Sequence, residues 1–535
     1  MQDRQLTVQS ILHHGAAVFR DSRVAAFDGA HVVRTAFADR AARVERLAAG
    51  LGHLGIRPGD RVATFCWNSA EHLEAYLAVP AMGAVLHTAN IRLFPEQLAY
   101  VVNHAEDRAI IVDSTLVPVL AKAAGRFRTV EHYIVVGDTQ AELPGTTTRY
   151  EEMLEAEPGC YPWPDLDERS AAVVCYTSGT TGNPKGVVYS HRSIYLHSMA
   201  ITSANCVGLG QNDRALVVPA MFHANSWGLP HAAWLAGSDL LFPGRYLQAE
   251  TLCGLIGLER PTVSAGVPTV WSDILRYADV HHPDLSSLRF VLCGGSAAPL
   301  SLVEGLQNRH GVRMFQAWGM TEISPIAAVA HPPKACAPGE EAAYRARTGR
   351  VIAGVELRVV EDGRVLPCDG ESVGEFEARG PWVTGAYYGD EGADRFHDGW
   401  LKTGDVGTLD ARGYLQIKDR AKDVIKSGGE WVSSVELENA IMAHPDVVEA
   451  AVIGVPDSRW DERPLACVVV REGSPVTPSD LCGFLNGRVA KWWIPERWAF
   501  VDAIPKTSVG KFDKKILRAR QQEGAITIVQ AAGAF

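Results

Sequence analysis

The sequence predicts an α/β protein with a large N-terminal domain of layered α/β subdomains plus a small β unit, followed by a small α+β C-terminal domain. Three observations support this fold class. Short apolar runs alternate with helical segments from Gly59 onward, short alternating runs with frequent turns follow Gly349, and a new helix-and-strand pattern begins near Arg420. The length of 535 residues also exceeds what one hydrophobic core serves, which favours several domains or subdomains.

The alternation is clearest between residues 61 and 138. Strands are expected at residues 61–67 (RVATFCW) and 84–90 (AVLHTAN), with a helix at residues 70–83 between them. A second helix is expected to begin at Pro95, because proline fits the first turn of a helix. Short buried strands follow at residues 108–113 and 132–138. Such alternation predicts a largely parallel sheet with helices packed on it.

Later segments run from a strand into a loop rich in Gly, Pro and Ser. They comprise residues 214–223, 261–275 and 289–300. In open α/β sheets, ligands bind beyond the carboxyl ends of the strands. We therefore expect four segments to form the walls of one site: residues 219–227 (PAMFHANSW), 266–269 (GVPT), 293–299 (CGGSAAP) and 317–322 (AWGMTE).

The C-terminal third changes character twice. Residues 349–363 and 413–420 alternate between apolar and polar and turn often, which predicts a small antiparallel β unit. Residues 433–455 then predict a helix followed by a strand, and Ser433 with Glu436 fits a capping box at the start of that helix. We therefore divide the chain into residues 1–419 and residues 420–535.

Composition excludes several classes of protein. The net charge of −11 disfavours a broad basic surface for nucleic acid. The ten cysteines include no C-x-x-C pair, so a zinc or iron–sulfur site has no support, and buried free thiols in a reducing compartment are expected. No stretch reaches the roughly 18 apolar residues of a membrane span. A soluble, cytoplasmic protein is the resulting expectation.

Residues 176–186 (YTSGTTGNPKG) have the composition of a phosphate-binding loop. Glycines allow backbone N–H groups to approach a ligand closely, and Lys185 adds a positive charge. The Walker pattern does not fit, because Gly186 follows Lys185 and Pro184 stands where that pattern requires its second glycine. The alternative is a solvated linker. Uncharged hydroxyl donors are supplied by Thr177, Ser178, Thr180 and Thr181.

Five segments together resemble the adenylate-forming superfamily of acyl-CoA synthetases, peptide-synthetase adenylation domains and luciferases. They follow in the order of that family: residues 176–186, 317–324 (AWGMTEIS), 399–405 (GWLKTGD), 419–433 (DRAKDVIKSGGEWVS) and 505–515 (PKTSVGKFDKK). The chain is most similar to fatty acyl-CoA synthetases of medium- or long-chain type. The resemblance implies that ATP activates a carboxylic acid to acyl-AMP with release of pyrophosphate, and that CoA then accepts the acyl group. ATP, Mg²⁺ and CoA are the implied cofactors.

The resemblance assigns the catalytic roles to four residues. Lys511 would bridge the acyl carboxylate and the α-phosphate, where two anions meet. Glu322, a hard carboxylate, would hold Mg²⁺ together with Thr177. Thr321 would contact phosphate, and His223 would approach the carboxylate or gate the pocket. A surface lysine, a helix-capping Thr-Glu pair and a packed core histidine are the alternatives from sequence alone.

The same resemblance assigns the nucleotide contacts. The Gly/Thr loop would close over the β- and γ-phosphates, Asp405 would accept the ribose hydroxyls, and Arg420 would assist at ribose or phosphate. Trp318 stands where many members have tyrosine, which keeps an aromatic face for adenine and removes a hydroxyl. The full set is Thr177, Ser178, Gly179, Thr180, Thr181, Gly182, Lys185, Gly294, Gly295, Ser296, Gln316, Ala317, Trp318, Gly319, Met320, Asp405 and Arg420.

Motion and the acyl pocket are also implied by the resemblance. Residues 420–535 would form a mobile domain that carries the catalytic lysine and turns at the hinge residue Lys422. After that motion, four residues would lie near the acyl carboxylate and the thiol path, namely Gly428, Gly429, Glu430 and Trp431. Trp431 could equally be a domain-interface anchor. Trp227 resembles an aromatic gate of long-chain synthetases, although a core role is the alternative.

Several functional alternatives stay open. The family's amino-acid-activating members place an aspartate where this chain has His223, which disfavours an amino-acid substrate. The acceptor could be an amine or a carrier-protein thiol instead of CoA, and the acid could be a short methylthio or an aryl acid. A catalytically silent nucleotide-binding protein is the alternative from another class. Chain length cannot be read from these residues, and a homodimer is expected only by analogy.

Overall fold

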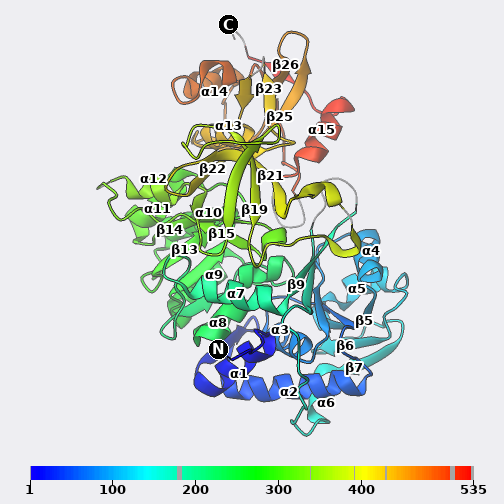
Figure 1. The fold of residues 1–535 in the computed structure, drawn as a ribbon. Coiled ribbons are helices and arrows are strands. Elements are labelled where there is room, and N and C mark those ends of the chain that lie inside the picture. The colour runs from blue at the N-terminus through cyan, green and yellow to red at the C-terminus, as the bar shows by residue number, and fades with distance from the viewer. Residues whose placement is uncertain are drawn as a thin grey trace. The chain divides into compact units, whose positions relative to one another are not determined.

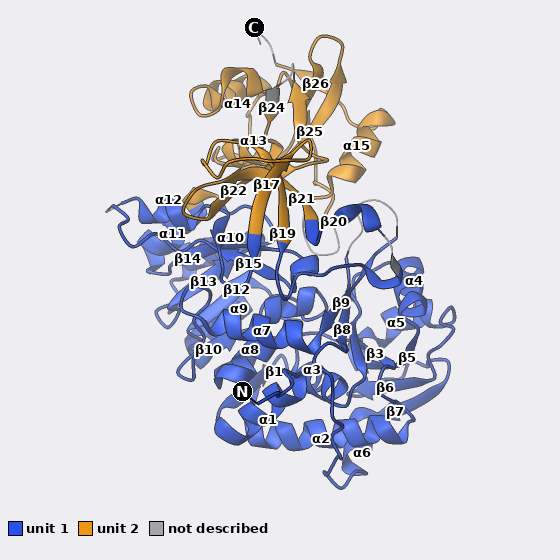
Figure 2. Ribbon diagram, in the orientation of Figure 1, with its two compact units in different colours: residues 1–298, 302–356, 379–401 blue, residues 299–301, 357–378, 402–535 orange. Residues whose placement is uncertain are grey.

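The computed structural model describes residues 2–177, 183–337, 339–390, 392–427, 430–506 and 512–531, with only the backbone described for residues 390, 430 and 431. The chain forms two compact units (Figure 2): residues 1–298, 302–356 and 379–401 form unit 1, and residues 299–301, 357–378 and 402–535 form unit 2. The predicted α/β class, with a large first and a small second part, is confirmed. The division of the chain into domains at residues 419 and 420 stays a prediction.

One sheet of unit 1 has seven strands in the order β7-β6-β5-β3-β4-β8-β9, and every neighbouring pair is parallel except β8 with β9. Its core packs α4 and α5 against the sheet through Leu98, Val101 and Leu120 (Figure 1). The elements are β3 (Arg61–Phe65), α3 (Ala70–Ala81), β4 (Val85–Thr88), α4 (Pro95–Ala105), β5 (Asp107–Asp113), α5 (Val117–Ala124), β6 (His132–Val136), β7 (Thr146–Arg149), α6 (Tyr150–Glu155), β8 (Ala171–Tyr176) and β9 (Gly186–Ser190).

The other sheet of unit 1 is parallel in its middle, from β1 through β11, β10, β12 and β13 to β14, and antiparallel at both ends, where β2 and then β15 and β16 are added. Helices α9, α10 and α11 share a hydrophobic core with it. The elements are α1 (Val8–Val18), β1 (Arg23–Phe27), β2 (Val32–Ala36), α2 (Phe37–His53), α7 (His191–Thr202), β10 (Arg214–Leu216), α8 (Leu229–Ala236), β11 (Asp239–Phe242), α9 (Ala249–Glu259), β12 (Val263–Gly266), α10 (Pro268–His281), β13 (Phe290–Cys293), α11 (Leu300–His310), β14 (Met314–Gly319), β15 (Ile326–Val329), α12 (Glu341–Arg345), β16 (Gly349–Val351) and β20 (Phe396–His397).

Unit 2 begins with the small β unit that the sequence predicts, followed by an α+β part. Along β25 and β26, alternate residues enter two different cores: Ala450 and Val452 pack with α13, whereas Ala451 and Ile453 pack with α15. The elements are β17 (Glu356–Glu361), β18 (Arg364–Val365), β19 (Gly374–Arg379), β21 (Trp400–Leu409), β22 (Tyr414–Arg420), β23 (Ile425–Ser427), β24 (Glu430–Val432), α13 (Ser434–Met442), β25 (Val447–Asp457), β26 (Asp461–Val470), α14 (Pro478–Leu485), β27 (Arg497–Phe500), α15 (Lys514–Gln522) and β28 (Val529–Gln530).

The predicted capping box of α13 forms only in part. The Ser433 hydroxyl accepts the N–H of Glu436 at 3.1 Å, as a cap should. The Glu436 carboxylate does not return the bond to Ser433, because it forms an ion pair with Lys418 at 2.6 Å. A charged partner on the neighbouring strand thus replaces the backbone partner that the motif predicts.

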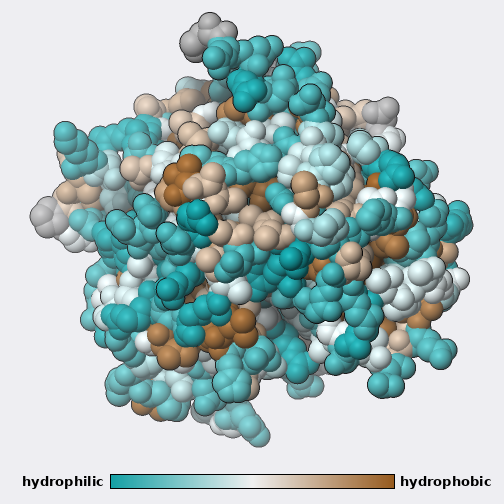
Figure 3. Space-filling model, turned by 90° about the horizontal axis from the view of Figure 1, so that it is seen from below, coloured by the Kyte–Doolittle hydropathy of each residue, from teal (hydrophilic) through white to brown (hydrophobic). Residues whose placement is uncertain are grey.

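The surface seen in Figure 3 is mostly hydrophilic, with hydrophobic side chains in small separate groups. Large apolar side chains that are exposed include Phe94, Leu258 and Val280. None of the helices in the described ranges combines the length and apolar character that crossing a membrane requires. All ten cysteines are free thiols.

Four of the buried histidines in unit 1 have a pKa well below the ordinary value. Desolvation lowers the pKa of His72, His191 and His231 to about 4, and that of His197 to about 3. Two of them accept backbone hydrogen bonds: Val8 N–H donates to His191 at 3.2 Å, and Ile326 N–H donates to His197 at 3.1 Å. A protonated imidazole has no acceptor, so protonation would break both bonds.

We expect these histidines to make the protein sensitive to acid. Their pKa values are lower in the folded chain than the ordinary 6.5, so the unfolded chain binds more protons below that pH. Stability should therefore fall from pH 6.5 down to about pH 4, by about 2 kcal/mol per fully buried histidine at pH 5. Unfolding temperatures at pH 7, 6 and 5 measure this directly.

A variant and its control isolate the effect. His197→Gln should reduce the loss of stability between pH 7 and pH 5, because one titrating group is removed while an acceptor is kept. His31→Gln, at an exposed position, should leave the loss unchanged. Equal stability of the unmodified protein at pH 7 and pH 5 would contradict the expectation.

Candidate active site

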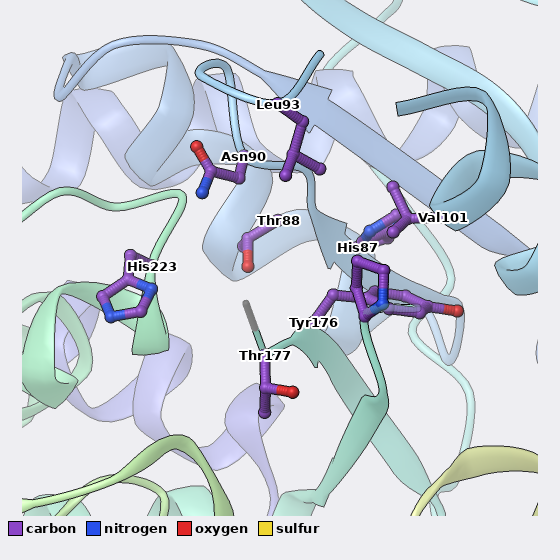
Figure 4. Close-up of a pocket in the computed structure, with 9 residues that line it drawn as sticks. His87, Thr88, Asn90, Leu93, Val101, Tyr176, Thr177 and His223 are labelled. Carbon is purple, nitrogen blue, oxygen red and sulfur yellow. The ribbon is translucent and has the colours of Figure 1, made fainter. Parts of the chain in front are cut away.

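The strand ends of the seven-stranded sheet surround a small pocket. Thr88 and Asn90 come from the end of β4, Tyr176 and Thr177 from the end of β8, and His223 from the loop after β10 (Figure 4). Parallel strands place their carboxyl ends along one edge, which explains why these segments meet. The structure thus brings together Thr177 and His223, which the sequence assigned to ATP and to the carboxylate.

The phosphate-loop segment is the connection of a hairpin. Thr177 N–H donates to the Lys185 carbonyl at 2.9 Å, and Tyr176 pairs with Gly186 across β8 and β9. The predicted contacts Ser178, Gly179, Thr180, Thr181 and Gly182 lie outside the described residues. On the far side of the hairpin, the Lys185 ammonium lies 5.1 Å from the centre of the Tyr387 ring, a cation–π contact.

A cluster of hydrogen-bonded and stacked side chains lies against the start of this hairpin, and the sequence interpretation missed it. The Tyr176 hydroxyl and His104 Nδ1 are 2.8 Å apart, and the Tyr176 ring centre lies 5.0 Å from that of His87. His87 Nδ1 is in turn 2.7 Å from Asp107, and both side chains are fully buried. The signal in the sequence was weak, namely one histidine in an apolar strand and one aspartate at the edge of another.

Thr321 and Glu322 follow β14 in a short 3₁₀ turn, Thr321–Ile323, and both are buried. The Tyr387 hydroxyl donates to the Glu322 carboxylate at 2.6 Å, and the Tyr189 hydroxyl donates to the Thr321 carbonyl at 2.7 Å. Burial raises the pKa of Tyr387, so this phenol keeps its proton and stays a donor. A tyrosine thus orients the carboxylate that the sequence assigned to Mg²⁺.

Gly319 permits the tight return from β14 to β15. A Cβ atom at this position would lie 1.9 Å from the Pro325 carbonyl oxygen, which no side chain can tolerate. The register shifts between Trp318 and Gly319, and Met320 N–H donates to Pro325 at 2.9 Å. This bulge fixes the path of Met320 into the turn that carries Thr321.

Gln316 ties the glycine-rich loop after β13 to β14. Its side-chain amide donates to the Ser296 carbonyl at 2.9 Å and accepts the Ala298 N–H at 2.8 Å. Gly294 lies close to β14, because a Cβ atom at this position would be 3.0 Å from the Ala317 carbonyl oxygen. Gly294, Ser296, Gln316 and Ala317 are therefore neighbours, as an adenine slot would require. Their contact with adenine stays a prediction, as does that of Gly295 and Trp318.

Residues 224–228, here called the acyl segment because they include the predicted gate residue Trp227, have an unusual backbone. Ala224, Asn225, Ser226 and Trp227 all have φ between 43° and 57°, and Gly228 has φ 77°. Left-handed conformation costs about 1–2 kcal/mol for each residue with a side chain. Strain of this size is typical of functional segments that the surrounding structure holds in place.

Within unit 2, Asp405 and Arg420 form a cross-strand pair on β21 and β22. Arg420 Nε lies 3.1 Å from the Asp405 carboxylate, which is buried, whereas the arginine is 44% exposed. Lys422 follows in a turn in which the N–H groups of Asp423 and Val424 both donate to the Arg420 carbonyl, at 2.8 and 2.9 Å. The structure thus brings the predicted ribose pair together, and the roles of both residues and of the hinge stay predictions.

Several predicted residues near the C-terminus lie outside the described residues, namely Lys511, Gly428 and Gly429. The backbone of Glu430 and Trp431 forms β24, where Trp431 pairs with Lys426. The segment that contains Lys511 starts and ends at neighbouring points, because Lys506 bridges to Phe512 and Asp513 N–H donates to Pro505 at 2.8 Å.

A second buried cluster surrounds Lys514 at the start of α15. The Lys514 ammonium is 2.7 Å from Glu438 and 2.5 Å from the Ser434 hydroxyl. Asp419, which directly precedes Arg420, accepts the Ser434 N–H at 2.6 Å. Desolvation raises the pKa of both carboxyl groups, and Lys514 opposes that shift. This cluster joins β22, α13 and α15.

Comparison with known proteins identifies the family. The AMP-binding enzyme profile matches residues 12–388, and the profile of the AMP-binding enzyme C-terminal domain matches residues 436–511. The chain belongs to the AMP-binding enzyme family. The predicted membership of the adenylate-forming superfamily is therefore confirmed.

Relatives of this AMP-binding enzyme match over nearly its whole length. The 3-methylmercaptopropionyl-CoA ligase of Ruegeria pomeroyi is 43% identical over 97% of this chain and 98% of its own. The long-chain-fatty-acid–CoA ligase of Thermus thermophilus is 45% identical over 97% and 96%, and the medium-chain-fatty-acid–CoA ligase of Ectopseudomonas oleovorans 41% over 97% and 97%. These relatives confirm the predicted enzyme class, an AMP-forming acid–thiol ligase that uses ATP and CoA.

Solved structures agree with the fold. The anthranilate CoA ligase AuaEII in complex with anthranoyl-AMP superimposes with a TM-score of 0.87 at 26% identity, over 97% of this chain and 98% of its own. ATP-bound MatB from Rhodopseudomonas palustris gives 0.84 at 26% identity, over 97% and 99%. The large N-terminal and small C-terminal parts are thus a shared architecture.

Gln316 offers a direct test of the loop geometry. Gln316→Leu keeps the volume and leaves the Ser296 carbonyl and the Ala298 N–H without their partner, which costs on the order of 1–3 kcal/mol. We expect the KM for ATP to rise about tenfold, while the unfolding temperature falls by a few degrees. Gln522→Leu, at an exposed position of α15, should change neither quantity. An unchanged KM for ATP in Gln316→Leu would contradict a nucleotide-binding role of this loop.

Proposed function

We propose that this enzyme activates a medium- or long-chain fatty acid with ATP and transfers the acyl group to CoA. The observation that carries the proposal is the match of about 97% of the chain to relatives named as fatty-acid–CoA ligases. The site supports it through the strand-end pocket with Thr177 and His223 and through the buried Glu322 beside Tyr387.

The reaction has two balanced steps. A carboxylate oxygen of the acid attacks the α-phosphorus of ATP, the bond to the bridging oxygen of the β-phosphate breaks, and pyrophosphate leaves. The CoA thiol then attacks the acyl carbonyl, loses its proton, and AMP departs. In the first step two anions must approach one another, so positive charge between them lowers the barrier. We assign this role to Lys511.

Further residues bind and orient the nucleotide. Lys185 and the hydroxyls of residues 177–181 would contact the β- and γ-phosphates, and Asp405 with Arg420 would hold the ribose. Thr177 and Glu322 would hold Mg²⁺, which neutralises phosphate charge when bound. The contact with Tyr387 suits Glu322 to metal binding. The Tyr387 hydroxyl donates to one Glu322 oxygen at 2.6 Å and so orients the carboxylate. Lys422 would serve as the hinge between the two steps.

A short methylthio acid is the second candidate substrate. It is supported by the 43% identity to the 3-methylmercaptopropionyl-CoA ligase of Ruegeria pomeroyi. An amine acceptor is supported more weakly, by a TM-score of 0.82 at 26% identity to the amide bond synthetase McbA from Marinactinospora thermotolerans. A cytoplasmic location, from the composition of the sequence, and a homodimer, by analogy with the family, complete the proposal.

A panel of acids tests the function. AMP formation is measured with C2 to C18 fatty acids, 3-methylthiopropionate and aryl acids, each with and without CoA. We expect CoA-dependent turnover within one window of fatty-acid chain lengths. Maximal turnover with 3-methylthiopropionate would favour the second candidate. AMP formation that CoA does not stimulate would overturn the choice of acceptor.

Lys511→Ala tests the charge that joins the two anions. We expect adenylation to fall by at least about 100-fold, because the lost charge acts in the transition state of that step. Thioester formation from acyl-AMP supplied ready-made should continue within about threefold. Lys515→Ala, the exposed neighbouring lysine four residues later, provides the control. Near-normal adenylation in Lys511→Ala would remove this residue from the mechanism.

A further inference from the structure

The left-handed conformation of residues 224–228 must be stabilised by contacts with the surrounding structure. Among the described residues, its four non-glycine members form the longest run of consecutive positive φ angles. Left-handed backbone is unfavourable for residues with a Cβ, so the intrinsic preference of these residues disfavours the observed conformation. The contacts around it must therefore define the conformation.

Asn225 supplies the central contact. Its side-chain oxygen accepts from the Cys175 thiol at 3.0 Å and from the Thr88 hydroxyl at 3.4 Å, and only 3% of the residue is exposed. Burial raises the pKa of Cys175 to about 12, so the thiol keeps its proton and can donate. Asparagine also tolerates left-handed φ better than most residues. Asn225 thus suits the position through both its backbone and its side chain.

Neighbouring contacts restrict the segment on both sides. The Ser226 hydroxyl donates to the Pro219 carbonyl at 2.6 Å, and the Asn68 amide donates to the same carbonyl at 2.9 Å. A Cβ atom at Gly228 would lie 2.6 Å from the His197 ring, so only glycine fits there. The chain is therefore fixed before and after Trp227.

This arrangement connects the acyl segment to two nucleotide loops. Cys175 lies on β8 two residues before Thr177, where the phosphate-loop hairpin begins. Trp227 lies against the loop after β13, since a Cβ on Gly294 would be 3.2 Å from its ring. Thr88 lines the same small pocket as Thr177 and His223 (Figure 4). Asn225 therefore holds one wall that the acid site and the nucleotide site share.

We propose that Asn225 is a positioning residue for the acid-binding step. By hydrogen bonding to Cys175 and Thr88, it keeps residues 224–228 left-handed and so holds the ring of Trp227, the predicted acyl gate, against Gly294. This inference rests on the proposed function. It does not require Asn225 to touch the acid or the nucleotide.

The test compares two variants that separate the effect of the Asn225 side chain from the effect of its backbone conformation. Asn225→Ala removes the hydrogen bonds and disfavours the left-handed turn, whereas Asn225→Gly removes the bonds and permits the turn. We expect Asn225→Ala to raise the KM for the preferred acid about tenfold or more, and the KM for ATP by a clearly smaller factor, because Trp227 also lies against Gly294 of the loop after β13. Asn225→Gly should lie between Asn225→Ala and the unmodified enzyme.

Two controls distinguish positioning from general damage. Cys175→Ser keeps a donor to Asn225, so the KM for the acid should stay near that of the unmodified enzyme. Cys175→Ala removes the donor and should raise the KM for the acid, as Asn225→Ala does. His282→Ala removes a side chain from another left-handed residue, with φ 50°, at an exposed position after α10. This variant should lose a little stability and keep its preference among acids.

The outcomes separate the inference from the function beneath it. An unmodified enzyme that forms no AMP with any acid would refute the proposed function. An active enzyme whose Asn225→Ala variant keeps the acid KM within about twofold would refute the inference alone. Equal rises in the KM for acid and ATP, with a lower unfolding temperature, would also refute it, since that pattern indicates general damage.

Discussion

Hydrogen bonds of buried polar side chains fix the conformation of the loops around the candidate active site. A polar group taken out of water without a hydrogen bond costs several times what a formed bond gains, so a satisfied network allows few alternative paths. Gln316 fixes the loop after β13, Tyr387 fixes Glu322, and Asn225 fixes the acyl segment. Each holds a strand-end loop that would otherwise have many conformations.

Sequence predicted the architecture because architecture follows from local pattern. The alternation of strands and helices between residues 61 and 138 predicted the parallel sheet and its strand-end loops. The order of the five motifs identified the family. The supporting pairs escaped prediction because they join distant residues: His104 with Tyr176 across 72 positions and Cys175 with Asn225 across 50. No periodicity encodes such contacts. The capping box failed for a similar reason, since Lys418 competes for Glu436 from another strand.

In unit 2, a buried cluster of charged side chains joins three elements of the fold. Lys514, Glu438 and Asp419 are three ionisable residues of one buried cluster, and removing one partner would leave an uncompensated buried charge. Such a cluster is costly to rearrange, so it fixes the start of α15 relative to α13 and β22. The segment with Lys511 therefore begins and ends on a stiff base.

The wall formed by Trp227 and Gly294 constrains how the substrate can change. A tilt of the Trp227 ring would press on Gly294, which already lies against the Ala317 carbonyl, so it would disturb the nucleotide loops as well. Under the proposed function, changes deeper in the acyl pocket would leave these strand-end loops untouched. Substrate length would then vary while the activation chemistry stays fixed. This fits the finding that relatives 43% and 45% identical to this chain are named for 3-methylmercaptopropionate and for long-chain fatty acids.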